Sequence, residues 1–280
     1  MTMRRVLVAC AAAGVLMMSA LTARADNEKG TAVIKGVAKL EGEAPKAKTI
    51  PVTQDPVCQQ AHPNGIKPQG ATVFGDGTLP YVFVYVKKGL TGKYDVPKAP
   101  ITIDQNTCMY KPHVQGMVVG QSIKILNSDP TTHNIHAKPK KNEEFNFSQT
   151  KKGLETIRKD KDTFNKPEIM VEIKCDVHPW MSAFVGVCEH PFFSTTGKGG
   201  TFEIKELPAG TYTIEAWHEM WGKMEQEVTI KDGETNEIEF KFAKKKAEAP
   251  VKADGKVVAG AAVSGGSECC AKSAAVAAGK

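Results

Sequence analysis

Seven consecutive residues in the second half of the chain, Cys175-Asp-Val-His-Pro-Trp-Met181, constrain its fold more than any other stretch. Their spacing lets a thiolate, an imidazole and a thioether turn toward one point from a single tight loop. Soft sulfur ligands together with imidazole select copper, and two His, one Cys and a weak axial Met form the blue-copper type of site. The loop supplies one His only, so this interpretation requires a second His from elsewhere in the chain.

The residues before the loop have the pattern of a β-strand. In Glu168–Cys175 the β-branched residues Ile169, Val171 and Ile173 alternate with mainly charged ones. This period of two predicts a half-buried strand that places Cys175 on its buried face. The alternative is a buried free cysteine beside a turn with an incidental His and Met, which leaves the joint spacing unexplained.

A second strand leads to the other predicted imidazole. Ser122–Ile125 alternates in the same way and breaks at Asn127-Ser-Asp-Pro130, which is a turn signal. His133 follows this turn. Two strand ends therefore bring the ligands together, and His133 is the candidate for the missing His.

The ligand residues and their surroundings resemble the cupredoxins. Cys175–Met181 is similar to the short ligand loop of amicyanin-like and pseudoazurin-like cupredoxins, and His133-Asn-Ile135 to the HN[VI] signature of their first His ligand. Upstream, Tyr110-Lys-Pro112 resembles their F-x-P element and Gly120-Gln-Ser-Ile123 their G-D-x-[VI] element. These matches follow the cupredoxin order over residues 101–190 and imply a Greek-key β-barrel.

The resemblance implies one copper ion that alternates between Cu(I) and Cu(II). It carries the ligand role onto His133, Cys175, His178 and Met181. It also implies that Asn134 steadies the loop around Cys175 through hydrogen bonds. Trp180 lies inside the loop, so we expect it to form an apolar collar with His178 at an exposed copper edge, where a partner docks and electrons enter. The alternative is that Trp180 plugs the end of the barrel.

The flanks of Cys175 argue against an enzyme. Multicopper oxidases and copper nitrite reductases connect blue copper to a second centre through a His-Cys-His sequence, whereas here Lys174 and Asp176 flank the Cys. We therefore expect a mononuclear type 1 copper protein that transfers single electrons, with a periplasmic redox protein such as a c-type cytochrome or a dehydrogenase as partner. The alternative function is periplasmic copper storage, delivery or sensing.

The first 25 residues are typical of a secretory signal peptide. Met1–Ala25 has a basic start, an apolar run and the cleavage signal Ala23-Arg-Ala25. We expect cleavage near Ala25 and a periplasmic or secreted protein; no other run approaches the ~20 apolar residues of a membrane span. Loss of three Arg would take Lys+Arg from 37 to 34 against 31 Asp+Glu, a net charge of +3. This charge is too small to indicate nucleic-acid binding.

Six of the seven cysteines follow the signal peptide, in a compartment that tolerates disulfides. Cys58 and Cys108 are the best candidates for a disulfide, because each lies near a turn in an ordered segment. The alternative is a second metal site in which these two thiols act with His62 and His113. No role follows from the sequence for Cys269-Cys270.

The rest of the chain predicts a second β-sandwich. Thr31–Leu40 and Tyr81–Val86 read as strands, and short strands separated by Gly, Pro and Asp-Gly turns follow His190. Thr201–Ile204 and Leu207–Ile214 resemble the carboxypeptidase regulatory-like (transthyretin-like) domain, which implies binding or scaffolding.

The expected fold class is therefore all-β, with a cupredoxin barrel inserted in a second small sandwich. The cupredoxin domain spans 101–190, and the carboxypeptidase regulatory-like sandwich comprises 26–100 plus 191–243. Two domains in tandem are the alternative. The Lys-, Ala- and Gly-rich tail 244–280 has little that can form a core and is expected to be disordered.

Overall fold

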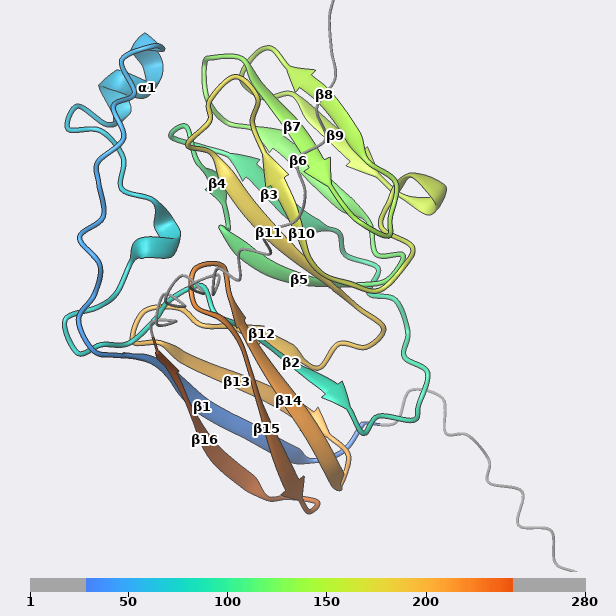
Figure 1. The fold of residues 1–280 in the computed structure, drawn as a ribbon. Helices are drawn as coiled ribbons and strands as arrows, with labels where there is room; N and C mark the ends of the chain where they lie inside the picture. The colour runs from blue at the N-terminus through green and yellow to red at the C-terminus, as the bar shows by residue number, and fades with distance from the viewer. Residues whose placement is uncertain (1–28, 244–280) are drawn as a thin grey trace, which may run out of the picture. The chain divides into compact units, whose positions relative to one another are not determined.

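The computed structural model describes residues 29–243, which form four β-sheets (Figure 1). Strands dominate this part of the chain, so the all-β prediction is confirmed. The expected signal peptide, the expected disordered tail and the Cys269-Cys270 pair lie outside the described residues. Within 29–243 no helix combines the length and apolar character that crossing a membrane requires.

The middle of the chain forms two sheets around one core. The first has the strand order β5-β11-β10-β7-β8 and the second the order β4-β3-β6-β9. Apolar residues of both sheets share this core, Ile103 and Ile125 from one and Ile135, Val171 and Ile173 from the other. The strands are β3 Ile101–Gln105, β4 Tyr110–Lys111, β5 Val114–Val118, β6 Ile123–Asn127, β7 His133–Lys138, β8 Phe145–Gln149, β9 Glu155–Arg158, β10 Glu168–Lys174 and β11 Ser182–Cys188.

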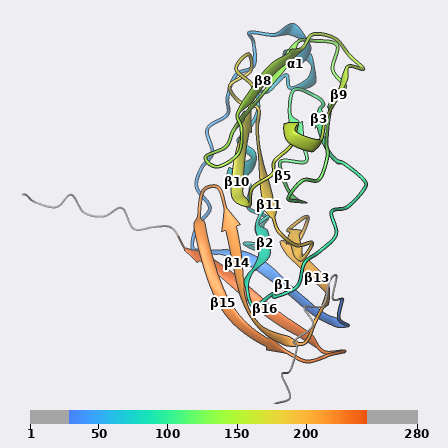
Figure 2. The ribbon, with the colours of Figure 1, turned by 90° about the vertical axis from the view of Figure 1, so that its right-hand side faces the viewer.

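Strands from both ends of the described chain form the other two sheets, with the orders β13-β1-β16 and β12-β2-β14-β15. Strand β1 pairs antiparallel with β13 and parallel with β16, so the blue N-terminal strand lies among orange C-terminal ones (Figure 2). The limits of the two predicted domains stay a prediction from the sequence. The strands are β1 Ala32–Glu41, β2 Phe83–Lys88, β12 Phe193–Thr195, β13 Thr201–Leu207, β14 Gly210–His218, β15 Gly222–Ile230 and β16 Thr235–Ala243.

The connection between β1 and β2 is long and mostly irregular. It contains helix α1, Pro56–Ala61, and the 3-10 turn η1, Gln69–Ala71; a second 3-10 turn, η2, spans Asp160–Asp162. Pro at the first helical position and an Asp before it are typical of a helix N-terminus. Three residues of the connection are buried in the core of the middle sandwich, namely Val52, Cys58 and Ile66.

The burial of strand β10 follows its alternation from Val171 onward, whereas Ile169 is only partly buried. Val171 and Ile173 are buried, and so is Cys175 directly after the strand. Glu168 also departs from the pattern, whose charged positions would be exposed. It is buried because its carboxylate accepts hydrogen bonds from the backbone N–H groups of Lys140 and Lys141. Such bonds offset the desolvation of a buried carboxylate.

Candidate metal centre

The loop between β10 and β11 folds back around the sulfur of Cys175. The Cys175 N–H donates to the Met181 carbonyl at 3.2 Å, and the Met181 N–H donates to the His178 carbonyl at 2.9 Å. The His178 N–H donates to Cys175 Sγ at 3.3 Å. These hydrogen bonds close one turn that contains a cysteine, a histidine and a methionine, and β11 begins directly after it at Ser182.

Two imidazoles and one thiol converge in the interior of the protein. His133 is the first residue of β7, and its Nδ1 lies 2.9 Å from Nδ1 of His178. Cys175 Sγ lies 3.9 Å from the same His178 nitrogen. The three residues offer donor atoms within 4.8 Å of one another and are 0%, 1% and 2% exposed for His133, Cys175 and His178 respectively. The structure thus brings together three of the four predicted ligands around one point.

Met181 occupies the end of the loop and is fully buried. It belongs to the same hydrophobic cluster as Cys175 and Trp180. Its side chain therefore packs in the core that also contains Cys175, and a contact of its sulfur with the metal stays a prediction.

Asn134 connects strand β7 to the ligand loop. Its side-chain oxygen accepts hydrogen bonds from the N–H groups of Asp176 at 2.5 Å and Val177 at 3.3 Å. Its amide nitrogen donates to Asn146 Oδ1 at 2.7 Å and to Asp176 Oδ2 at 3.2 Å. Because Asn134 follows His133 directly, these bonds hold the loop against the strand that supplies the other imidazole.

The edge of the site at His178 is covered, so the expectation of an exposed collar there is wrong. His178 and Trp180 are 2% and 7% exposed, and their ring centroids lie 5.0 Å apart. The Trp180 indole N–H donates to the carbonyl of Cys108 at 3.1 Å. The cover is helix α1, whose position no local pattern around the ligand loop reveals.

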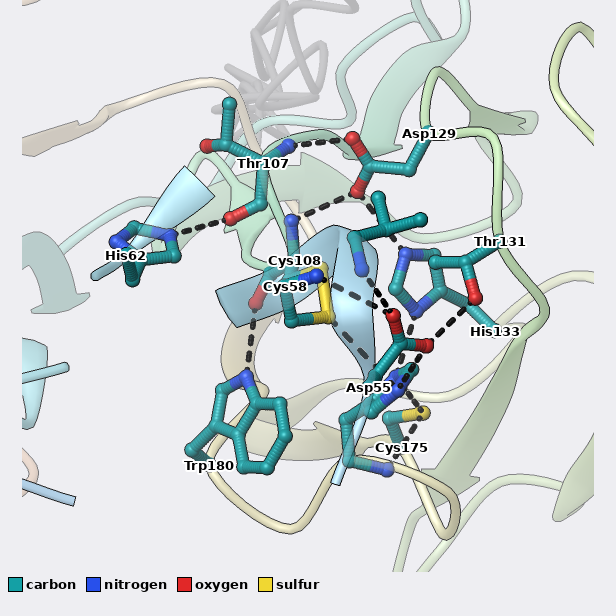
Figure 3. The surroundings of a disulfide bond; sticks show 12 residues. Asp55, Cys58, His62, Thr107, Cys108, Asp129, Thr131, His133, Cys175 and Trp180 are labelled. Carbon is teal, nitrogen blue, oxygen red and sulfur yellow. Dashed lines mark hydrogen bonds and ion pairs between the residues drawn. A yellow bond between two sulfur atoms is a disulfide. The ribbon is translucent and has the colours of Figure 1, made fainter. Parts of the chain in front are cut away.

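A disulfide joins Cys58 of α1 to Cys108 (Figure 3). Cys58 Sγ is 3.8 Å from His178 Nε2. The alternative of a second metal site built from these two thiols, His62 and His113 is wrong in this structure. Nε2 of His62 instead lies 2.7 Å from the Thr107 carbonyl oxygen, and Nε2 of His113 lies 2.6 Å from Oε1 of Glu219.

Each of the two imidazoles has a carboxylate on its outer nitrogen. His133 Nε2 lies 3.0 Å from Asp129 Oδ2, and His178 Nε2 lies 3.1 Å from Asp55 Oδ2. Histidines that bind metals commonly use such partners, which fix the tautomer and the ring orientation. Both Nδ1 atoms consequently point inward, toward each other and toward Cys175.

Sequence reasoning missed both carboxylates. Asp129 stands in the turn signal before His133, so its proximity to that imidazole could have been inferred from the chain. Nothing in the sequence around Asp55 indicates a distant partner for its side chain.

The electrostatics of the site favour an ionised sulfur. Burial alone would raise the pKa of the Cys175 thiol, but hydrogen bonds from His133 and His178 outweigh it and lower the pKa to about 6. Burial alone would lower the pKa of His133, but hydrogen bonds to Asp129 and Cys175 raise it to about 9. At neutral pH the site thus pairs a thiolate with an imidazolium.

This donor set fits a copper ion. Thiolate and imidazole are soft or intermediate ligands, and two His, one Cys and a neighbouring Met are the ligands of blue-copper sites. A metal must displace the protons of its ligands. Here the thiol is already acidic, and the proton between the facing Nδ1 atoms is the one to be displaced.

The lowered pKa of Cys175 predicts a distinct ultraviolet titration step in the metal-free protein. Raising the pH through about 6 should convert this thiol to thiolate, so absorbance of the thiolate band should rise there rather than near pH 9.0, where a thiol ordinarily titrates. The measurement is a difference ultraviolet titration, with Cys175→Ser as the control that lacks the step. Burial raises the pKa of the other described free thiol, Cys188, so it should not contribute in this range. A step that survives in Cys175→Ser contradicts the assignment.

Comparison with known proteins finds matches among solved structures only. No family model matches the chain, and no curated protein matches it. The Cu-containing nitrite reductase of Thermus scotoductus SA-01 is 20% identical over 37% of this chain, with a TM-score of 0.29, and the match spans 25% of that enzyme's chain. Amicyanin of Paracoccus versutus is 22% identical over 37% of this chain and 96% of its own, with a TM-score of 0.27.

A purple cupredoxin of Nitrosopumilus maritimus is similar to the same degree. It is 21% identical over 31% of this chain and 97% of its own, with a TM-score of 0.25. Because all three TM-scores are below 0.5 and each match covers little more than a third of the chain at most, none of these structures defines its fold or its function.

Proposed function

We propose that this chain is an exported, mononuclear type 1 copper protein that transfers single electrons between periplasmic redox partners. The observation that carries the proposal is the buried convergence of His133 Nδ1, His178 Nδ1 and the Cys175 sulfur, each ring held by a carboxylate at its other nitrogen. Bound copper would supply a one-electron Cu(I)/Cu(II) couple.

Each residue of the site would have its own role in holding copper. His133, Cys175 and His178 would hold the copper ion as strong ligands, and Met181 would be its weak fourth ligand. Asn134 holds the loop through the Asp176 and Val177 N–H groups, which keeps the thiolate in place. The nearly complete burial of the three strong ligands excludes water, and the axial ligand and the surroundings of the sulfur tune the potential.

Copper storage, delivery or sensing is the second candidate function. A delivery protein must release its metal readily, whereas here a disulfide and helix α1 cover the His178 side of the site. That cover favours retention of the ion and therefore an electron carrier. The partner in the proposed function is a redox protein such as a c-type cytochrome or a dehydrogenase.

The test is to load the purified mature chain with Cu(II) and to record its visible and electron spin resonance spectra. We expect an intense thiolate-to-copper band and a small hyperfine splitting. Rapid, reversible reduction by a c-type cytochrome, with no loss of copper to a chelator on the same timescale, supports the carrier. A pale spectrum contradicts the type 1 site, and copper that leaves for the chelator within the turnover time supports delivery instead.

A further inference from the structure

One contact of the metal centre comes from a part of the chain far from the ligand loop. Asp55 stands in the irregular connection between β1 and β2, 123 residues before His178, yet its Oδ2 lies 3.1 Å from His178 Nε2. We propose that Asp55 is a positioning residue of the metal centre, which holds His178 in the tautomer that turns its Nδ1 lone pair toward the metal. This inference rests on the proposed function and adds to it a residue outside the cupredoxin-like segment.

The two oxygens of the Asp55 carboxylate have different partners. Oδ1 accepts from the N–H groups of Val57 at 2.8 Å and Cys58 at 3.2 Å, which caps helix α1. Oδ2 accepts from the hydroxyl of Thr131 at 2.6 Å and faces His178 Nε2. An ionised carboxylate can only accept, so the hydrogen of the imidazole must be on Nε2. Nδ1 of His178 is then free to accept a proton or to bind a metal.

The disulfide holds this arrangement in place. Cys58 and Cys108 are bonded to each other, and each donates its backbone N–H to a carboxylate that faces an imidazole. The Cys58 N–H bonds Asp55 at 3.2 Å, and the Cys108 N–H bonds Asp129 Oδ2 at 2.7 Å. Figure 3 shows the disulfide and these two carboxylates. One covalent link therefore fixes the carboxylate partners of both imidazoles.

Burial makes the contact effective. The side chains of His178 and Asp55 are 2% and 15% exposed, so water competes weakly for the Nε2 hydrogen. Val52 and Ile66 fix the connection on either side of α1, since both are buried in the core of the middle sandwich. Loss of a partner of this kind typically lowers metal affinity by roughly 10–100-fold.

The experiment compares Asp55→Asn with Asp55→Ser, because both residues cap helices well. In the Asn variant the side-chain oxygen must stay on the Val57 and Cys58 N–H groups, which places the amide NH₂ against His178 Nε2. That nitrogen must then accept, and the hydrogen moves to Nδ1. In the Ser variant no donor faces Nε2, so a water molecule can serve either tautomer. Asp232→Asn, in the exposed turn after β15, is the matched control.

Two readouts test the inference. Long-range ¹H–¹⁵N correlation of the metal-free protein should report His178 protonated at Nε2 in the wild type and in Asp232→Asn, and at Nδ1 in Asp55→Asn. Chelator competition should show Cu(II) affinity falling roughly 10–100-fold in Asp55→Asn, with Asp55→Ser between it and the wild type. A purely structural role as helix cap predicts wild-type values for both variants, and that result overturns the proposal.

The two readouts also separate this inference from the proposed function. The tautomer is measured without metal, so a wild-type protein that lacks the blue band contradicts the type 1 site while the tautomer result still decides the role of Asp55. An unchanged His178 tautomer in Asp55→Asn overturns the positioning role even if copper binds as a type 1 centre.

Discussion

Replacing Cys175 by Ser should abolish the intense visible band of the copper-loaded protein. The band requires a sulfur-to-copper bond, and Cys175 is the only free thiol among the described residues that lies beside the two imidazoles. The variant should also bind copper more weakly, by at least the roughly 10–100-fold expected for loss of an outer partner. The Ser side chain is similar in size to that of Cys, and its oxygen can still accept the hydrogen bond from the His178 N–H, so the fold should survive.

The measurement is Cu(II) titration followed in the visible range, with circular dichroism to verify the fold. Cys188→Ala is the matched control, because it removes the other described free thiol, which lies in a separate hydrophobic cluster. The control should keep the band at full intensity. A band that persists in Cys175→Ser, or disappears in Cys188→Ala, contradicts the ligand assignment.

Removing the Cys58–Cys108 disulfide should produce the largest loss of stability. The link joins residues 50 positions apart, and the chain-entropy model for a loop of this length gives roughly 4 kcal/mol. For a protein of this size that corresponds to a decrease in melting temperature of roughly 10 °C. The replacement should be Cys58→Ser with Cys108→Ser together, since a single change leaves an unpaired buried thiol.

Thermal unfolding of the metal-free double variant, beside the wild type and Cys188→Ala, measures this effect. The double variant should also lose copper to a chelator faster, because α1 and Asp55 are no longer linked covalently to the turn that carries Cys108. A melting temperature equal to that of the wild type contradicts a stabilising disulfide. Unchanged copper release contradicts its role as a cover of the metal centre.

The ligand loop was predictable because its information is local. A period of two in β10 determines which face is buried, and that face continues to Cys175 at the strand end. The spacing to His178 then closes one turn. The turn signal at Asn127–Pro130 likewise places His133 at the start of β7. Alternation predicts burial less well where a charged side chain accepts hydrogen bonds from backbone N–H groups. Glu168 is buried against the pattern for this reason.

The amino-acid sequence by itself determined the all-β class and the residues that converge on one point, because strand periodicity and tight-turn spacing act over a few residues. Only the tertiary structure decided what covers that point. Asp55 reaches His178 across 123 residues, through a connection with no periodic pattern whose path depends on a disulfide and on Val52 and Ile66 entering another sandwich's core. The edge of the site at His178, expected to be exposed, is therefore buried, and the imidazole there contacts the Asp55 carboxylate.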